Sequence, residues 1–244
     1  MTVNPSLVAQ FAPTGVLRAS LNMGNPVLAH SRTAVERPAG VSIDLARRLG
    51  RELGVDVRLL EFDTAARSVE ALAAGGADIG FMAIDPQRAS SIEFTAAYVQ
   101  IEGAYLVPQD SPIFSNDQVD QPGIRIMVGA GSAYALYLSR NIKQAQLVTV
   151  ATSEAVVDAM LRDKLPVAAG VRQQLEADAR RVGAVRVLEG RFMVINQAMA
   201  MRRDRSAPAH AYLADFVERM KREGVVAEGL QRHGIEGARV ADAG

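Results

Sequence analysis

Short apolar runs alternate along the chain with longer stretches in which apolar residues recur every three or four positions. The short runs are typical of buried strands, and the longer stretches are typical of amphipathic helices. In the first half, strands are expected at 17–21, 55–59 and 77–83. The helix after the first strand should begin at a Ser42 cap and end at Gly54. This order predicts a doubly wound α/β unit that binds ligands at the carboxyl ends of its strands.

The second half of the chain repeats this order of strands and helices. Its strands are expected at 124–128, 147–150, 167–169 and 191–201. Thr152 or Ser153 is expected to cap the helix that follows the second of these strands. Another helix should begin near Pro208. Residues 238–244 are expected to form a loose tail.

A polar segment with two prolines, at 108–112, marks a change of composition between the two halves. The closing helices have no strands of their own, so we expect them to return to the first unit. The predicted bounds are 1–106 with 198–244 for the first domain, 107–197 for the second, and 104–108 and 194–199 for the hinge. A ligand would then bind in the cleft between the domains.

Composition narrows the function classes. The 244 residues carry 27 basic and 27 acidic side chains, so no nucleic-acid partner and no anionic membrane surface is expected. Cysteine is absent, which excludes disulfides, thiolate zinc sites and cysteine nucleophiles. The 3 histidines lie far apart in the sequence, and no metal or cofactor is implied. No apolar run approaches the roughly 20 residues of a membrane helix.

Several short segments between residues 15 and 134 form an ordered set of motifs. They read GVLRASLN at 15–22, GVSIDLA at 40–46, LAAGGAD at 72–78, IDPQR and then IEFTAAY within 84–98, and VGAGSA at 128–133. Their order and spacing resemble the solute-binding proteins of polar amino-acid ABC importers, the bacterial extracellular solute-binding proteins of family 3. The resemblance implies an α/β, two-lobed type II periplasmic-binding-protein fold, with each lobe a mixed sheet flanked by helices.

The resemblance assigns the most specific role to Arg88. In the family, this arginine forks onto the ligand carboxylate, because a guanidinium presents paired donors that match a carboxylate. Without the surrounding motif, Arg88 would be interpreted as an ordinary surface arginine. The motif implies instead that it binds the ligand.

The segment Gly131-Ser132-Ala133 lies between an expected strand and the start of an expected helix. Backbone N–H groups and a serine hydroxyl at such a place can bind an anion, although an ordinary N-cap would also explain the pattern. We expect Ser132 and Ala133 to contact the ligand from the second lobe.

The other first-lobe candidates follow or end strands. Asn22 and Asn25 come just after the first strand, where they either hydrogen-bond the ligand or build a turn. Phe81, Met82 and Ala83 end a later strand, where backbone groups usually bind the ligand in the family. Phe81 is either an apolar wall of the site or part of the core, and the family's hydroxyl is missing at Ala83.

The chain departs from the family where an amino-acid ligand's ammonium group would bind. Amino-acid binders usually place an aspartate there, but Val171 stands at or near that position and Arg172 follows it. Either Glu102 substitutes as the anion, or the ligand has no ammonium group. Arg172 either holds a second anionic group of the ligand or starts a helix and faces water. The ligand class is therefore open between an amino acid and a small carboxylate.

The resemblance implies a solute-binding protein, not an enzyme, that captures a small carboxylate-bearing ligand by hinge closure for ABC-type uptake. Its expected partners are that ligand, an amino acid or related organic acid, and the transporter's membrane subunits. A monomer is expected. The alternatives are a cyclohexadienyl-dehydratase-like enzyme that uses Asp85 or Glu102 as its acid, and a stand-alone ligand-sensing domain. The first 11 residues lack the features of an export signal. The protein is therefore expected to be periplasmic if a signal peptide was removed, and cytoplasmic if the sequence as written is complete.

Overall fold

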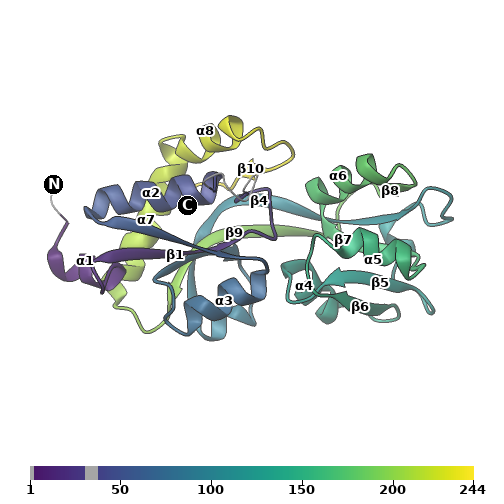
Figure 1. The fold of residues 1–244 in the computed structure, drawn as a ribbon, viewed down its shortest axis with the longest axis horizontal. Helices are drawn as coiled ribbons and strands as arrows, with labels where there is room; N and C mark the ends of the chain where they lie inside the picture. Colours follow the sequence, from purple (N-terminus) through teal and green to yellow (C-terminus); the bar gives the residue numbers. More distant parts are fainter. Residues whose placement is uncertain (1–2, 31–37) are drawn as a thin grey trace. The chain divides into compact units, whose positions relative to one another are not determined.

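The chain divides into two units in the computed structural model, which describes residues 3–30 and 38–244 (Figure 1). Unit 1 comprises the chain up to Gln100 together with Asn196–Gly244, and unit 2 comprises Ile101–Ile195. Each unit has its own helices and its own part of a mixed sheet.

Unit 1 begins with parallel strands and ends with helices that return to them. Its strands are β1 (Val16–Asn22), β2 (Asp56–Phe62), β3 (Ile79–Ala83), β10 (Arg239–Val240), the first part of β4 (Ile92–Pro108) and the last part of β9 (Met193–Arg202). Its helices are α1 (Pro5–Phe11), α2 (Val41–Leu53), α3 (Ala65–Ala73), α7 (Ala207–Arg222), α8 (Val225–Arg232) and the 3-10 helix η1 (Arg88–Ser90). The strand order is β2-β1-β3-β9-β4, with β1 parallel to β2 and β3, and β9 antiparallel to β3.

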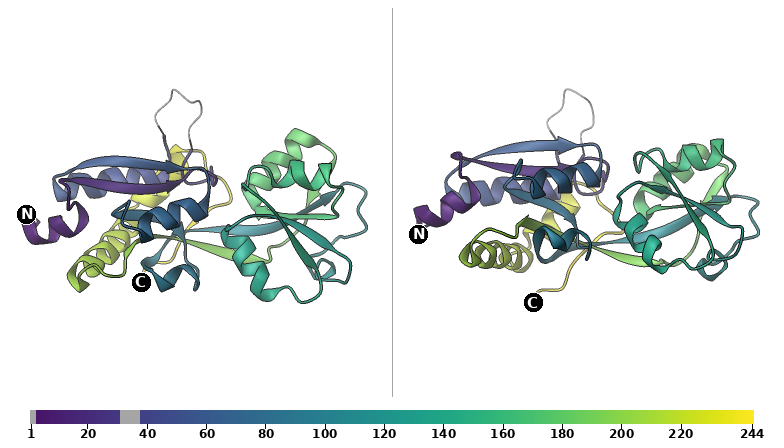
Figure 2. Two further views of the ribbon diagram at one scale, coloured as in Figure 1. Left: turned by 60° about the horizontal axis from the view of Figure 1, so that its bottom comes forward. Right: turned by 90° about the horizontal axis from the view of Figure 1, so that it is seen from below.

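Helices α2 and α3 lie on opposite faces of the parallel strands of unit 1 (Figures 1 and 2). Helix α2 buries the apolar face that includes Ile43, Leu45 and Leu49, and Gly54 ends it in the left-handed conformation with φ 69°. Thr64 caps α3, because its side chain accepts a hydrogen bond from the backbone of Arg67 at 3.3 Å. Helices on both faces of parallel strands are the arrangement that the sequence pattern predicts.

Unit 2 has the same kind of layering in a shorter stretch of chain. Its strands are the last part of β4, β5 (Arg125–Gly129), β6 (Gln146–Val150), β7 (Val167–Val171), β8 (Val185–Val187) and the first part of β9. Its helices are α4 (Ala133–Asn141), α5 (Val156–Arg162), α6 (Arg172–Val182) and the 3-10 helix η2 (Asn116–Gln118). The strand order is β4-β7-β5-β6, with β5 parallel to both of its neighbours and β4 antiparallel to β7.

Two long strands connect the units. β4 leaves unit 1 after Gln100, and β9 re-enters it at Asn196. These crossings lie a few residues before the predicted bounds at 106–107 and 197–198. Pairing along β4 continues past the first crossing, because Gly103 to Leu106 are hydrogen-bonded to β7.

Each unit has its own apolar core. In unit 2, side chains from α5, α6 and the central strands pack together, including Met127, Val157, Met160 and Leu175. In unit 1, a cluster beneath α3 joins Leu72, Ala77, Met82, Ile92 and Ala200. Helix α7 buries the face that the sequence predicts, with Leu213, Phe216, Val217 and Met220. Two separate cores agree with the two α/β units expected from the chain.

Two predicted helix caps are wrong, and the reason is the same in both cases. Helix α2 begins one residue before Ser42, whose hydroxyl lies 3.0 Å from the hydroxyl of Tyr98. Helix α5 begins beyond Thr152 and Ser153, and Tyr134 donates a hydrogen bond to the Ser153 hydroxyl at 2.9 Å. A distant hydroxyl, which local spacing does not reveal, has replaced the backbone N–H as partner of each serine.

The predicted loose tail is also wrong, because the end of the chain is attached to unit 1. Strand β10 pairs with β4, with Val240 opposite Val99. The Lys221 ammonium is buried, lies 2.6 Å from the carboxylate of Glu218, and donates to the carbonyl of Asp242 at 2.8 Å. A buried ammonium needs such partners, so the last residues are held against α7.

Candidate functional site

The carboxyl ends of β1 and β3 meet at one edge of the unit 1 sheet. The two strands are parallel, with Ser20 opposite Gly80. Asn22 is the last residue of β1, and Ala83 is the last residue of β3. In doubly wound sheets this edge is where ligands bind.

Three of the predicted residues, Asn22, Asn25 and Phe81, line one pocket of unit 1. The other residues that line it are Leu28, Ala29, Ser42 and Gln197. Side chains alternate along a strand, so Met82 points away from Phe81 and packs in the apolar core. Phe81 is therefore a wall of the pocket, whereas Met82 has only its backbone to offer a ligand at this edge.

The polar groups of this pocket are uncharged. The Asn22 Oδ1 atom accepts a hydrogen bond from the Gly24 backbone at 3.1 Å, which orders the turn after β1. The Asn25 Oδ1 atom is buried and has no hydrogen-bond partner among the described residues. A buried acceptor without a partner is costly in a folded protein, so the Asn25 oxygen needs a hydrogen-bond donor from a water or a ligand.

Arg88 lies just beyond the end of β3, as the first residue of η1. Only 6% of it is exposed, and its Nη1 donates to the carbonyl oxygen of Ala83 at 3.1 Å. Burial lowers the pKa of Arg88, while the negative charge of Asp85 acts in the opposite direction. The guanidinium stays charged in a protein, so this edge of the sheet holds a largely desolvated cation.

Asp85 shapes the turn that presents Arg88. Its Oδ1 accepts the backbone N–H of Gln87 at 2.9 Å, and its carbonyl oxygen accepts that of Ala89 at 3.0 Å. The side chain is 3% exposed, and these bonds are those of a capping residue.

The second-lobe candidates Ser132 and Ala133 lie at the start of α4 in unit 2. Ser132 is the N-cap, and its hydroxyl accepts a hydrogen bond from the backbone of Ala135 at 3.1 Å. Ala133 is the first helical residue and is half-buried. The N-terminus of this helix carries partial positive charge, which favours an anion.

Glu102 and Arg172 form an ion pair within unit 2. The Arg172 Nε donates to one carboxylate oxygen of Glu102 at 2.8 Å, and the Arg191 Nη1 donates to the other at 2.8 Å. The hydrogen bond from Arg191, helped by Arg172, lowers the pKa of Glu102 against the effect of burial. Arg172 starts α6 directly after Val171, but it does not simply face water, because this ion pair holds it.

The fold and the sequence together identify the family. The profile of the bacterial extracellular solute-binding proteins, family 3, matches residues 24–235. The chain belongs to this family. The resemblance that the motifs indicate is therefore confirmed. Members are solute-binding proteins of amino-acid ABC transporters and are typically extracellular or periplasmic.

Solved structures confirm the type II periplasmic-binding-protein fold. The solute receptor for L-cysteine of Neisseria gonorrhoeae has a TM-score of 0.82 at 19% identity, over 96% of this chain and 99% of that chain. A protein described as an ABC-transporter binding component from Wolinella succinogenes, complexed with lysine, has a TM-score of 0.77 at 20% identity, over 90% of this chain and 95% of that chain. The ancestral amino-acid-binding protein AncCDT-1, described as a precursor of cyclohexadienyl dehydratase, has a TM-score of 0.76 at 20% identity, over 92% and 98%. Comparison with the curated proteins gives no significant match.

The sequence analysis missed part of the pocket in this solute-binding protein. Gln197 is nearly fully buried, and its backbone pairs with that of Ala83. A signal for it exists, because Gln197 is a polar residue within the apolar run of β9. Tyr98 supports the pocket from behind, with its ring edge-on to Phe81 at 6.2 Å between centroids. Burial raises the pKa of Tyr98, which remains a neutral phenol.

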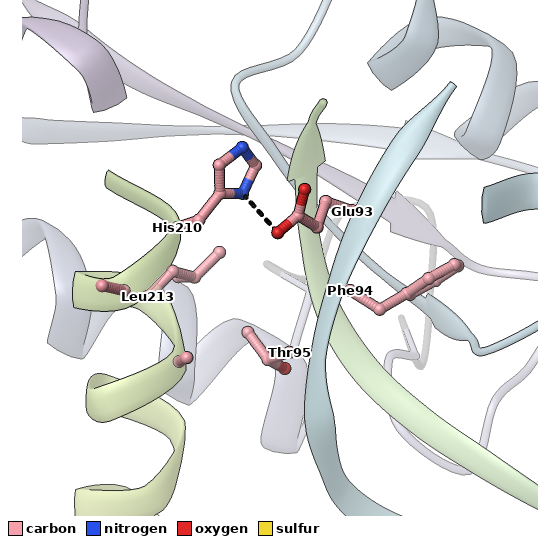
Figure 3. Close-up of a pocket in the computed structure, with 7 residues that line it drawn as sticks. Glu93, Phe94, Thr95, His210 and Leu213 are labelled. Atoms are coloured by element: carbon pink, nitrogen blue, oxygen red, sulfur yellow. Dashed lines mark ion pairs between the residues drawn. The ribbon is translucent and has the colours of Figure 1, made fainter. Parts of the chain in front are cut away.

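Unit 1 has a second cavity, of about 220 Å³, which none of the predicted residues lines (Figure 3). Glu93 and His210 point toward each other from β4 and α7, with 3.7 Å between the Oε1 and Nδ1 atoms. Thr95 also lines the cavity, but its hydroxyl is engaged by backbone groups. The lining of this cavity is mainly apolar side chains around one ion pair, whereas Asn22, Asn25 and Gln197 line the other pocket.

No helix in the described part of the chain combines the length and the apolar character needed to span a membrane.

Proposed function

We propose that this solute-binding protein captures a small carboxylate-bearing solute, an amino acid or a related organic acid, by closing its two units on it. The captured solute would pass to the membrane subunits of an ABC importer. The observation that carries the proposal is the charged residue Arg88, of which only 6% is exposed, just beyond the carboxyl end of β3 at the edge of the unit 1 sheet.

The physical support for a carboxylate comes from the strength of its pairing with a guanidinium. The pairing is bidentate and charge-assisted, and it is stronger where water is excluded. Removing one partner of such a desolvated pair costs about 2–5 kcal/mol of binding free energy. This corresponds to a loss of affinity between roughly 30-fold and several thousand-fold.

Closure needs a ligand contact that only the closed form makes. We assign this contact to the N-terminus of α4, with the backbone N–H groups near Ala133 and the cap residue Ser132. A carboxylate bound by Arg88 and by these donors would favour the closed population, because a ligand shifts an equilibrium only by its differential affinity. We propose that the protein does this as a monomer outside the cytoplasmic membrane.

The test is isothermal titration calorimetry of amino acids and related carboxylates with wild type, Arg88→Ala and Arg88→Lys. We expect Arg88→Ala to abolish measurable binding, and Arg88→Lys to restore only part of it, because an ammonium lacks the bidentate fork. Arg67→Ala is the matched control, since the Arg67 side chain is 64% exposed in an i,i+4 pair with Asp63. Equal affinities of Arg88→Ala and wild type, with both folded by circular dichroism, would refute the proposal.

A dehydratase activity is not proposed, because neither candidate acid is suited to donate a proton. Arg191 and Arg172 lower the pKa of Glu102, so Glu102 is a carboxylate at neutral pH. The side chain of Asp85 accepts a backbone hydrogen bond in its own turn. We expect no turnover of prephenate or arogenate, and turnover that Glu102→Gln or Asp85→Asn abolishes would contradict a purely binding role.

A further inference from the structure

The described residues that line the unit 1 pocket of Asn22, Asn25 and Phe81 offer neutral polar groups and no negative charge. Two asparagines, one glutamine and one serine are the polar residues that line it among the described residues. An α-amino acid brings an ammonium group together with its carboxylate, so its binding site must also stabilise a positive charge. Among the described residues, no anion lines this pocket.

The described carboxylates within four residues of a pocket residue in the sequence, together with Asp63, are engaged elsewhere. Asp78 pairs with Arg18 at 2.8 Å and with Arg205 at 3.4 Å. The Oδ2 atom of Asp44 lies 2.9 Å from the Arg232 Nη1 atom and 2.8 Å from the His233 Nε2 atom. Asp63 pairs with Arg67 at 3.0 Å. Asp85 receives the backbone hydrogen bond of its own turn.

Glu102, the anion that the sequence offers in place of the aspartate, is already paired within unit 2. Both carboxylate oxygens of Glu102 receive arginine hydrogen bonds at 2.8 Å, one from Arg172 and one from Arg191. A ligand ammonium would have to displace an arginine and leave a guanidinium without its partner, which is unfavourable. The position expected for the ammonium-binding aspartate is occupied by Val171, which is buried at the end of β7.

The buried Oδ1 of Asn25 calls for a donor. It lines the pocket and has no hydrogen-bond partner among the described residues. A ligand hydroxyl or amide N–H satisfies a neutral carbonyl oxygen without bringing an unpaired charge into the pocket.

We infer that the ligand is a small carboxylate without an ammonium group, such as a hydroxy acid, whose uncharged hydroxyl or amide donor binds Asn25. This inference rests on the proposed function, because it takes the carboxylate contact with Arg88 as given. The ligand then enters as a net anion that the positive charge of Arg88 attracts, and the neutral amides bind the rest of its polar groups.

The experiment compares ligands that share a carbon skeleton and differ in one group. Calorimetry with L-lactate against L-alanine, and with 2-hydroxyglutarate against L-glutamate, measures the preference of wild type directly. We expect the bound hydroxy acid to have at least tenfold higher affinity than its amino acid, which is about 1.4 kcal/mol. Asn25→Asp should move this preference at least tenfold toward the amino acid, because it places a carboxylate where the ammonium would lie.

A matched control separates this effect from a general change in charge. Asn141→Asp introduces the same charge at an exposed position of α4 in unit 2, and it should leave the preference unchanged. Amino acids that bind wild type as tightly as the hydroxy acids, with Arg88→Ala abolishing binding, would overturn the inference and leave the proposed function standing. Binding that survives Arg88→Ala would overturn the proposed function, and no binding of any of these carboxylates would count against both.

Discussion

Asp78 is the residue whose replacement should destabilise unit 1 most clearly. Its side chain is 0% exposed and lies at the start of β3. Its Oδ2 accepts hydrogen bonds from the backbone and the Nε of Arg18 at 2.9 and 3.0 Å, and its Oδ1 accepts from the Arg18 Nη2 at 2.8 Å. The Arg205 guanidinium lies 3.4 Å away. One carboxylate therefore joins β1, β3 and the segment before α7.

The Asp78→Asn variant keeps the shape of the side chain but removes its charge and two acceptor positions. Breaking a buried ion pair by removing one partner costs about 3–5 kcal/mol, because the other charge stays buried. Arg18 and Arg205 side chains are 24% and 19% exposed, so water relieves part of this cost and the lower end applies. We expect a loss of about 3 kcal/mol, or a Tm lower by roughly 6–12 °C.

Urea denaturation followed by circular dichroism measures this loss. The matched control is Asp63→Asn, since the Asp63 side chain is 60% exposed in its pair with Arg67 and should contribute at most about 0.5 kcal/mol. If Asp78→Asn unfolds within about 1 kcal/mol of wild type, the carboxylate does not hold these elements together as argued.

Two further predictions concern pH and the turn after β1. The pKa of Glu102 lies below its ordinary value of 4.5, so its ion pair stabilises unit 2 above that pH and is lost as the pH falls through the folded value. Glu102→Gln should therefore be less stable than wild type at neutral pH, with a gap that narrows below pH 4.5 in denaturation experiments; a constant gap would contradict this. In Gly24→Ala, the new Cβ would lie 2.4 Å from the backbone oxygen of Asp63, so the turn must move. Calorimetry should show weaker ligand binding with the fold retained, and unchanged affinity would show that the turn does not shape the pocket.

Local patterns in the sequence were enough to predict most of the elements and the order in which they occur. Apolar spacing placed α2 and α7, and Gly54 ends α2 where a left-handed residue was expected. No strands were expected beside the closing helices after Met201, which predicted that the chain returns to the first unit, and it does so. The motif around Asp78 indicated the family, although its physical role as an ion-pair centre was not visible from the motif alone.

Contacts between residues far apart in sequence decided what these patterns missed. The Ser42 hydroxyl meets Tyr98 56 positions away, and Glu102 meets Arg172 70 positions away. Capping rules and apolar periodicity describe neighbours within one or two turns, so they carry no information on which distant polar group a strand register brings alongside.

The sequence by itself determined the α/β order, the family and the position of the arginine most suited to a carboxylate. Only the tertiary structure decided that Glu102 is already paired and that the Asn25 oxygen is buried with no hydrogen-bond partner among the described residues. The physical reason is that charge and hydrogen-bond satisfaction belong to the folded surroundings of a group, whereas residue type and spacing belong to the chain.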